Sequence, residues 1–132
     1  MPQRRSHSTG TDFEARIGYA RAVRLGDVVH VSGTLGMDAG GRPPAGAYAQ
    51  SVAALRRIQG ALEALDATLA DVVRTRMYVV DVERHQLDVG RAHSEFFAGV
   101  RPASTMIGIA GLVGPEFLVE IEVEAIVGGR PS

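Results

Sequence analysis

Hydrophobic residues recur every three or four positions between residues 47 and 69, which is the spacing of one face of an α-helix. That face carries Tyr48, Val52, Leu55, Ile58, Leu62, Leu65 and Leu69. The charged residues of the segment, such as Arg56 and Arg57, fall elsewhere, where water can solvate them. A second helix is predicted over about residues 85–98, and Pro102 follows closely enough to help end it. Its expected buried positions are Val89, His93, Phe96, Phe97 and Val100.

Strands are predicted where apolar and polar residues alternate. The segments "YARAVRLGD" and "VVHVSG" form a hairpin, and "STMIGIAGL" and "FLVEIEVEAIV" are two later strands. The strongest signal is "DVVRTRMYVVDV" at 71–82, with Val73, Thr75, Met77 and Val79 on one face and Arg74, Arg76, Tyr78 and Val80 on the other. In the last strand, Glu120, Glu122 and Glu124 alternate with apolar residues. One face of that strand is therefore apolar, and the other is a row of three carboxylates.

The predicted order ββαβαββ indicates an α+β fold, a two-layer sandwich in which two helices cover one face of a mixed sheet. Residues 15–132 are predicted to form a single domain, and residues 1–14, polar and rich in Ser, Thr and Gly, a flexible N-terminal tail. The sheet face opposite the helices must meet water or another subunit. Because several strands carry residues suited to contacts on both faces, we expect homo-oligomerisation through this face instead of exposure to water.

Composition narrows the classes of partner. The chain has 132 residues, the size of one domain, with 45% hydrophobic and 22% charged residues. A net charge of -1 and few aromatic residues argue against a nucleic-acid partner. The chain has no cysteine, which excludes disulfides and thiolate nucleophiles. No apolar run approaches the roughly 20 residues that span a membrane, and no secretory signal follows the basic N-terminus, so we expect a cytoplasmic protein.

The row of carboxylates is the first candidate site. Repulsion between neighbouring carboxylates raises the pKa of at least one of them, and such a group can deprotonate a water molecule. The pattern alone fits better with a solvated acidic face, or with ion pairs to Arg74 and Arg76. Ser32 and Gly33 end a predicted strand, where a glycine either admits a ligand to the backbone or makes an ordinary turn. The four histidines lack metal-binding spacings, so no metal site is expected.

Five segments together resemble the Rid family of reactive intermediate deaminases, also called YjgF. They are "GYARAVRLGDVVHVSGTLG", "VVRTRMYVVDV", the "FF" at 96–97, "RPAST" and "VEIEVEAI", spanning about Gly18 to Val127. The resemblance implies a chorismate-mutase-like fold, a homotrimer with its sheets facing the centre, and pockets in clefts between subunits. It also implies hydrolysis of reactive imines and enamines, such as 2-aminoacrylate, to a keto acid and ammonia, without a cofactor.

The resemblance also implies roles for individual residues. Glu122 matches the carboxylate that orients the attacking water, which separates it from Glu120 and Glu124. Tyr19 matches an aromatic residue at the pocket mouth. The other matching substrate-binding positions are Ser32, Gly33, Thr105 and Met106.

Ser104 is where the sequence departs from the family pattern. Family members active on amino-acid imines have Pro-Ala-Arg-Ser or Pro-Ala-Arg-Thr there, and this arginine grips the substrate carboxylate with two hydrogen bonds. A serine hydroxyl is neutral, short and offers one donor. Losing the charged contact costs on the order of 2–5 kcal/mol of carboxylate binding. Arg101, three residues earlier, could replace it only if the loop rearranged.

Three functions are therefore weighed. The expected one is a Rid-family enzyme that hydrolyses an imine or enamine other than the usual amino-acid imines, with Ser104 where the carboxylate-binding arginine would be. The alternative is a trimer that binds a small metabolite without chemistry. An endoribonuclease, a name often attached to the family, is disfavoured by the net charge and the absence of a basic, aromatic-lined groove.

Overall fold

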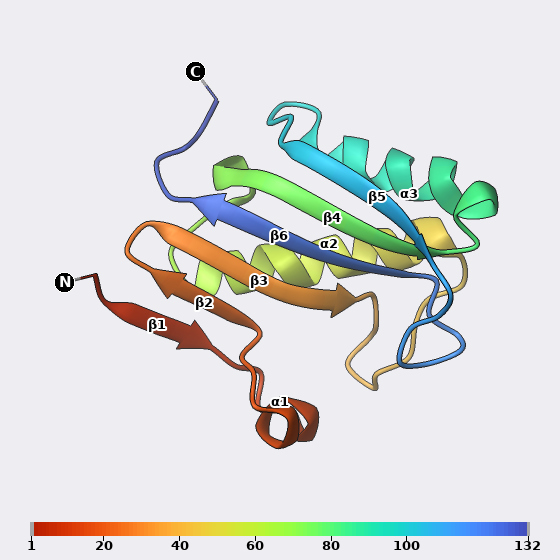
Figure 1. Cartoon of the computed structure of the whole chain (residues 1–132), viewed down its shortest axis with the longest axis horizontal. Helices are drawn as coiled ribbons and strands as arrows, with labels where there is room; N and C mark the ends of the chain where they lie inside the picture. Colours follow the sequence, from red (N-terminus) through yellow and green to blue (C-terminus); the bar gives the residue numbers. More distant parts are fainter. Residues whose placement is uncertain (1, 132) are drawn as a thin grey trace.

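The computed structural model describes residues 2–131, which form a six-stranded sheet of order β1-β2-β3-β6-β4-β5 (Figure 1). The strands are β1 (Arg4–His7), β2 (Ala22–Leu25), β3 (Val28–Leu35), β4 (Val72–Val80), β5 (Ala103–Ile109) and β6 (Val119–Ile126). The helices are α1 (Asp12–Ile17), α2 (Ala47–Ala64), a 3₁₀ turn η1 (Leu69–Asp71) and α3 (Val82–Phe97). β4 and β5 are parallel, and the other neighbouring strands are antiparallel.

The sheet is mixed and two long helices lie on one of its faces, as the sequence predicted. From β2 onward the order is ββαβαββ, and α2 and α3 pack against each other behind the sheet (Figure 1). α2 is shorter than expected because it ends at Ala64, and Asp66 then adopts a left-handed φ of 61°. Leu69 therefore lies in η1 instead of the helix.

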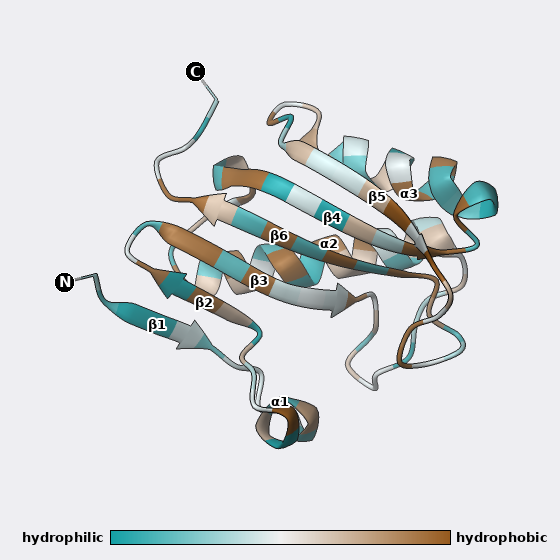
Figure 2. Ribbon diagram, viewed as in Figure 1, coloured by the Kyte–Doolittle hydropathy of each residue, from teal (hydrophilic) through white to brown (hydrophobic). Residues whose placement is uncertain are grey.

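The alternation of faces in the central strands is also confirmed. Along β6, Val119, Ile121, Val123 and Ala125 are buried under α2, while the glutamates between them face away from the helices. Figure 2 shows this alternation of hydrophobic and hydrophilic residues along β6. Leu55, Ile58 and Leu62 of α2 are fully buried against it. Tyr48 and Val52 are only half-buried, and the buried positions of the first turns are Ala47, Gln50, Ser51 and Ala54.

Residues 2–14, which the sequence predicted to be part of a flexible tail, contain regular structure, and residue 1 lies outside the described residues. Arg4–His7 form β1, which pairs with β2, and α1 begins at Asp12. The Glu14 carboxylate holds the connection between them: it accepts hydrogen bonds from the Ser8 hydroxyl (2.6 Å), the Thr9 hydroxyl (2.6 Å) and amide (3.3 Å), and the Thr11 hydroxyl (2.7 Å). The small polar residues that suggested disorder are therefore the donors that order this segment.

Gln50 joins α2 to two loops that the sequence does not connect. Its side-chain amide donates to the carbonyls of Pro44 (3.2 Å) and Glu116 (3.0 Å), and its side-chain oxygen accepts from the Leu118 amide (2.8 Å). Gln50 is 2% exposed, so these partners replace water. The residue thus fixes the loops before α2 and before β6 relative to each other.

The sheet face that carries the glutamates is uncovered by helices in the described part of the chain. Glu120, Glu122 and Glu124 are half-buried there, beside Arg76 and Tyr78 of β4. Within residues 2–131, no helix has both the length and the apolar character needed to cross a membrane.

Replacing Gln50 with leucine should lower the free energy of unfolding by about 1–3 kcal/mol, because the buried Leu118 amide loses its acceptor. Urea denaturation followed by circular dichroism measures the change. Gln59→Leu on the same helix is the control, since no side-chain hydrogen bond of Gln59 is found, and it should change stability by less than about 0.5 kcal/mol. Equal stability of Gln50→Leu and wild type would contradict the role given to Gln50.

Glu14 should make stability depend on acidity. Burial alone would raise the pKa of Glu14, but the hydrogen bonds from Ser8, Thr9 and Thr11 outweigh it and lower the pKa from 4.5 to about 2. A lowered folded pKa stabilises the fold above the unfolded value, and this contribution is lost as the pH falls from about 4.5 towards 2.

Glu14→Gln should therefore be less stable than wild type by roughly 1–3 kcal/mol near neutral pH, with the difference shrinking below pH ~4. Thermal or urea unfolding at several pH values measures this convergence. The exposed carboxylate of α2 gives a control, Glu63→Gln, whose curve should run parallel to that of wild type. A gap between Glu14→Gln and wild type that stays constant down to pH 2 would refute the assignment.

Candidate functional site

A β-bulge interrupts β3 at Ser32 and Gly33. Val31 pairs with Val123 and Thr34 with Ile121, so β3 has one residue more than β6 between these pairs. The Ser32 hydroxyl donates to the carbonyl of Ala20, which precedes β2, at 2.7 Å and makes no hydrogen bond with β6. The bulge leaves Gly33 outside the regular pairing, and bulges of this kind are frequent beside active sites.

Gly33 is in contact with two charged side chains. Its carbonyl accepts a hydrogen bond from Nη2 of Arg21 at 2.7 Å. The Glu120 side chain lies so close to the Gly33 Cα that a Cβ atom there would overlap the carboxylate. Glu120 can occupy this position only because residue 33 has no side chain. The requirement for glycine thus comes from packing and not from the backbone conformation of a turn.

Two cavities meet at Gly33 and Glu120. The first, which we call the glutamate cavity, measures about 370 Å³ and is lined by Gly33, Tyr78, Ile109, Leu112, Glu120 and Glu122. The second, which we call the tyrosine cavity, measures about 310 Å³ and lies towards α1. Its lining includes Phe13, Tyr19, Arg21, Gly33, Arg57, Val113, Phe117 and Glu120.

Glu122 is held by two neighbours on β4. It accepts a hydrogen bond from the Tyr78 hydroxyl at 2.5 Å, and Nη1 of Arg76 lies 3.8 Å from its second oxygen. Arg76 also forms an ion pair of 3.0 Å with Glu124. The ion pairs that the sequence suggested across the strands are thus made by Arg76. They fix the Glu122 carboxylate at the wall of the glutamate cavity.

The carboxylate with the raised pKa is Glu120. Burial raises the pKa of Glu120, the positive charge of Arg21 opposes the shift, and the negative charge of Glu122 adds to it. The repulsion within the row, on which the expectation rested, is therefore only the smallest of these causes, and burial is the largest. A carboxyl group with a raised pKa, that of Glu120, stands beside Glu122 at the junction of the two cavities.

The predicted site residues fall into two separate groups within one chain. Tyr19 and Gly33 line the tyrosine cavity, and Glu122 lines the glutamate cavity next to it. Ser32 lines neither of these cavities and is bonded to the Ala20 carbonyl. The other predicted residues, Ser104, Thr105 and Met106, lie on β5 at the edge of the sheet.

Ser104 belongs to a hydrogen-bonded row on the helix side of β5. The Thr75 and Ser104 hydroxyls are 2.8 Å apart, and the Thr75 hydroxyl is also 2.8 Å from Nε2 of His93. Burial lowers the pKa of His93. Arg101 lines a shallow hollow of about 420 Å³ with His93, so it lies on this side and lines neither of the cavities with Glu122 or Tyr19.

Two arginines at these cavities, Arg21 and Arg57, were not predicted from the sequence, and Glu120 was predicted only as a member of the carboxylate row. Arg57 was placed on the wet surface of α2, yet it points to the end of β3 and donates to the Leu35 carbonyl at 2.6 Å. Arg21 is only 8% exposed. The signal that could have found them is two arginines beside otherwise apolar, buried positions, in "YARAV" and "ALRRI". Within residues 2–131, no cluster of three or more His, Asp or Glu side chains could hold a metal ion.

Comparisons with known proteins agree with the fold. The family model described as Endoribonuclease L-PSP matches residues 9–127. The chain is 34% identical over 131 residues to the uncharacterised protein SCO2049 of Streptomyces coelicolor, with 94% of this chain and 92% of that protein covered. It is 28% identical over 104 residues to the RutC family protein YjgH of Escherichia coli, covering 78% and 79%. The crystal structure of Rv2704 from Mycobacterium tuberculosis, a member of the YjgF/YER057c/UK114 family, has a TM-score of 0.88 and 45% identity, covering 95% and 100%.

The contact between Tyr78 and Glu122 should be visible in a titration. The hydrogen bond to Glu122 raises the pKa of Tyr78, followed by burial and the charge of Glu122, because the phenolate would lie against a carboxylate. In Glu122→Gln the pKa of Tyr78 should fall towards the ordinary value. Ring-carbon NMR of labelled tyrosines between pH 8 and 12 measures it, with assignment from Tyr78→Phe.

The control for this titration is Glu124→Gln, which removes a carboxylate from the same row without touching Tyr78. It should leave the Tyr78 transition near its wild-type position. If Glu122→Gln and Glu124→Gln shift the transition equally, the pairing of Tyr78 with Glu122 is not specific.

Proposed function

Because the chain belongs to the endoribonuclease L-PSP family, also called YjgF, we propose that it hydrolyses the C=N bond of an imine or its enamine tautomer. The observation that carries the proposal is the Glu122 carboxylate, fixed by Tyr78 and Arg76 at the wall of a cavity that also holds apolar side chains. Such a cavity can take a small organic molecule and place a water molecule against a carboxylate.

In the proposed reaction, Glu122 acts as the general base. It takes a proton from water as the water oxygen bonds to the imine carbon, and the π electrons of C=N move to the nitrogen. Glu122 then returns this proton to the nitrogen, which gives a carbinolamine. The hydroxyl proton of the carbinolamine passes to the amino nitrogen as the C–N bond breaks, and a carbonyl compound and ammonia leave. An enamine first accepts a proton at carbon to become the imine. No metal is needed, because an imine carbon is already electrophilic.

Pockets shared between subunits follow from the separation of the two groups of site residues. β3 and β5 are three strand spacings apart in the order β3-β6-β4-β5, which is roughly 14 Å. One small ligand cannot touch both Gly33 on β3 and Ser104 on β5 of the same chain. A pocket that uses both groups needs a second copy, and the uncovered sheet face with Glu122 and Thr105 is a surface suited to self-association. The homotrimer in this proposal comes from the family resemblance.

Ser104 favours a substrate other than the usual amino-acid imines. Its hydroxyl is engaged with Thr75 and cannot make two parallel charged hydrogen bonds to a carboxylate. The substrate in this proposal therefore has no carboxylate on the carbon next to the imine. The second candidate function is a trimer that binds a small molecule without reacting with it. The engagement of Glu122 by two side chains, Tyr78 and Arg76, is compatible with this function as well.

The test is hydrolysis of a panel of imines generated in the assay, with and without a carboxylate beside the C=N bond. Wild type should hydrolyse imines without that carboxylate, and Glu122→Gln should be slower by about 10²- to 10⁴-fold because the general base is lost. Glu124→Gln is the matched control and should stay within a few-fold of wild type.

Light scattering checks the assembly of each variant, and the expected mass is three times the 14.0 kDa of one chain. Equal activity of Glu122→Gln and wild type would rule out the proposed mechanism. If no imine is turned over by wild type, and Ser104→Arg gains activity on amino-acid imines, the wild-type protein is a binding trimer instead.

A further inference from the structure

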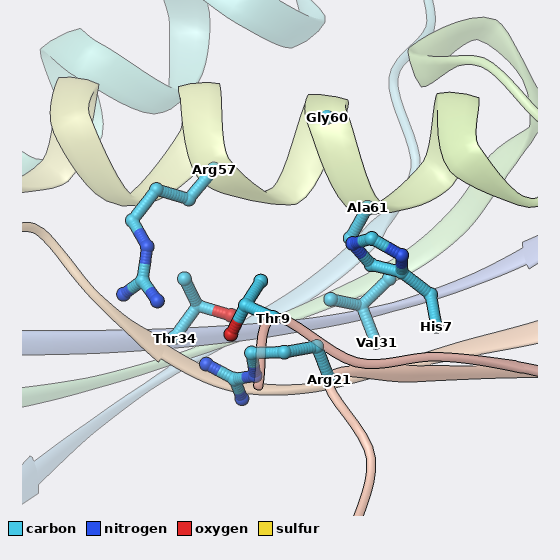
Figure 3. A pocket seen from close by; sticks show the side chains of 8 residues that line it. All are labelled: His7, Thr9, Arg21, Val31, Thr34, Arg57, Gly60 and Ala61. Atoms are coloured by element: carbon cyan, nitrogen blue, oxygen red, sulfur yellow. The ribbon is translucent and has the colours of Figure 1, made fainter. Parts of the chain in front are cut away.

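Two arginines from distant parts of the chain share a cavity wall. Arg21 precedes β2 and Arg57 lies on α2, and both line the tyrosine cavity and an adjoining cavity of about 290 Å³. Figure 3 shows the adjoining cavity, with both guanidinium groups at the same end and Thr9 and Thr34 beside them. Two like charges brought together inside a protein are unfavourable unless something compensates them.

Arg21 has an unused donor. The residue is 8% exposed, and its Nη2 donates to the Gly33 carbonyl at 2.7 Å. Its guanidinium also lies 5.6 Å from the centre of the Tyr19 ring. The Nε donor of Arg21 is buried and has no hydrogen-bond partner. Buried polar atoms without a partner are rare in folded proteins and need a specific explanation.

Neither carboxylate that lines the tyrosine cavity, Glu14 or Glu120, forms an ion pair with the two arginines; Glu120 acts on Arg21 only through its charge. Glu14 is occupied by the hydroxyls of Ser8, Thr9 and Thr11 and forms no ion pair with either arginine. Among residues 2–131, neither Arg21 nor Arg57 forms an ion pair at all. Burial, and then the charge of Arg21, lower the pKa of Arg57, which agrees with an excess of positive charge here.

We propose that Arg21 and Arg57 bind an anionic oxygen group, a carboxylate or a phosphoryl group, at the anionic end of the ligand. The apolar part of that ligand lies in the tyrosine cavity, against Tyr19 and Phe117. Guanidinium groups suit this task because they present several donors in one plane. The anion offsets the repulsion between the two arginines, neither of which has an ion-pair partner among residues 2–131.

The position of this site specifies the class of substrate, and this step rests on the proposed function. The tyrosine cavity and the glutamate cavity share Gly33 and Glu120. A ligand anchored at the arginines therefore extends past Gly33 towards Glu122. The substrate is an imine or enamine whose anionic group lies several bonds from the reacting carbon, on the β3 side of the pocket and not at Ser104.

The experiment measures binding of butyrate, butyramide and inorganic phosphate to the full-length protein by NMR titration. Butyrate or phosphate should bind, and butyramide, which has the shape of butyrate without the charge, should bind at least about tenfold more weakly. Arg57→Met should weaken anion binding by about 10- to 100-fold. Arg56→Met changes the neighbouring, exposed arginine of the same helix and should leave binding unchanged.

The two anions distinguish the sources of the group. Binding of butyrate but not phosphate assigns the site to carboxylates, and the reverse assigns it to phosphoryl groups. Arg21→Lys provides a second variant, which keeps the charge but loses the planar fork and should also weaken binding. The proposal is overturned if neither anion binds, if butyramide binds as well as butyrate, or if the Arg57→Met and Arg56→Met variants bind equally.

This result is separable from the fate of the proposed function. Glu122→Gln should bind the anion as wild type does while it loses turnover. Turnover of neutral imines without anion binding would leave the proposed function standing and remove the arginine site. Anion binding without any turnover, in every variant, would keep the arginine site and remove the hydrolase.

Discussion

The β-bulge at Ser32 and Gly33 is the constraint on which the arrangement of the site depends. Inserting one extra residue into β3 takes Gly33 out of register with β6, so that its carbonyl is free to accept from Arg21. The missing side chain leaves room for Glu120. The bulged residue Gly33 lines both the tyrosine cavity and the glutamate cavity, and its carbonyl is the acceptor for the buried Arg21. A single irregularity in one strand therefore links charge on the α1 side of the molecule to the carboxylates of β6.

A second feature is that some carboxylates are engaged in contacts within the protein, whereas others line cavities. Glu14 is saturated by hydroxyl donors from its own segment, and Glu124 is paired with Arg76. Glu120 and Glu122 remain at cavity walls. Because the Glu14 carboxylate is engaged by these hydroxyls, it forms no ion pair with Arg21 or Arg57 across the cavity. Hydrogen bonds within residues 8–14 thus limit the pairing of charges in a cavity that this segment borders.

Much of the fold follows from the sequence, because burial on one face imposes a period of two on strands and of 3.6 on helices. The alternation along β4 and β6 and the core face of α2 were predicted on this basis. β1 and α1 were not, since four polar residues give no periodicity and the donors that order them act through Glu14. The site was predicted only in part. The residue pattern pointed to the glutamate row and to Gly33, and the family resemblance singled out Glu122. Arg21 and Arg57 come together only when α2 packs against the sheet, and no local pattern records that contact.

The order of strands has a consequence for how the chain acquires its structure. β6 is the last strand in the described sequence, yet it lies between β3 and β4 in the sheet. β3 and β4 have no ladder with each other, so one backbone edge of each stays unpaired until residues 119–126 have been synthesised. Pairing of this kind joins segments about 90 residues apart in the chain and is slow because the loop must close first. A chain that has been synthesised only up to β6 therefore exposes unpaired strand edges, a feature of the intermediates on which chaperones act.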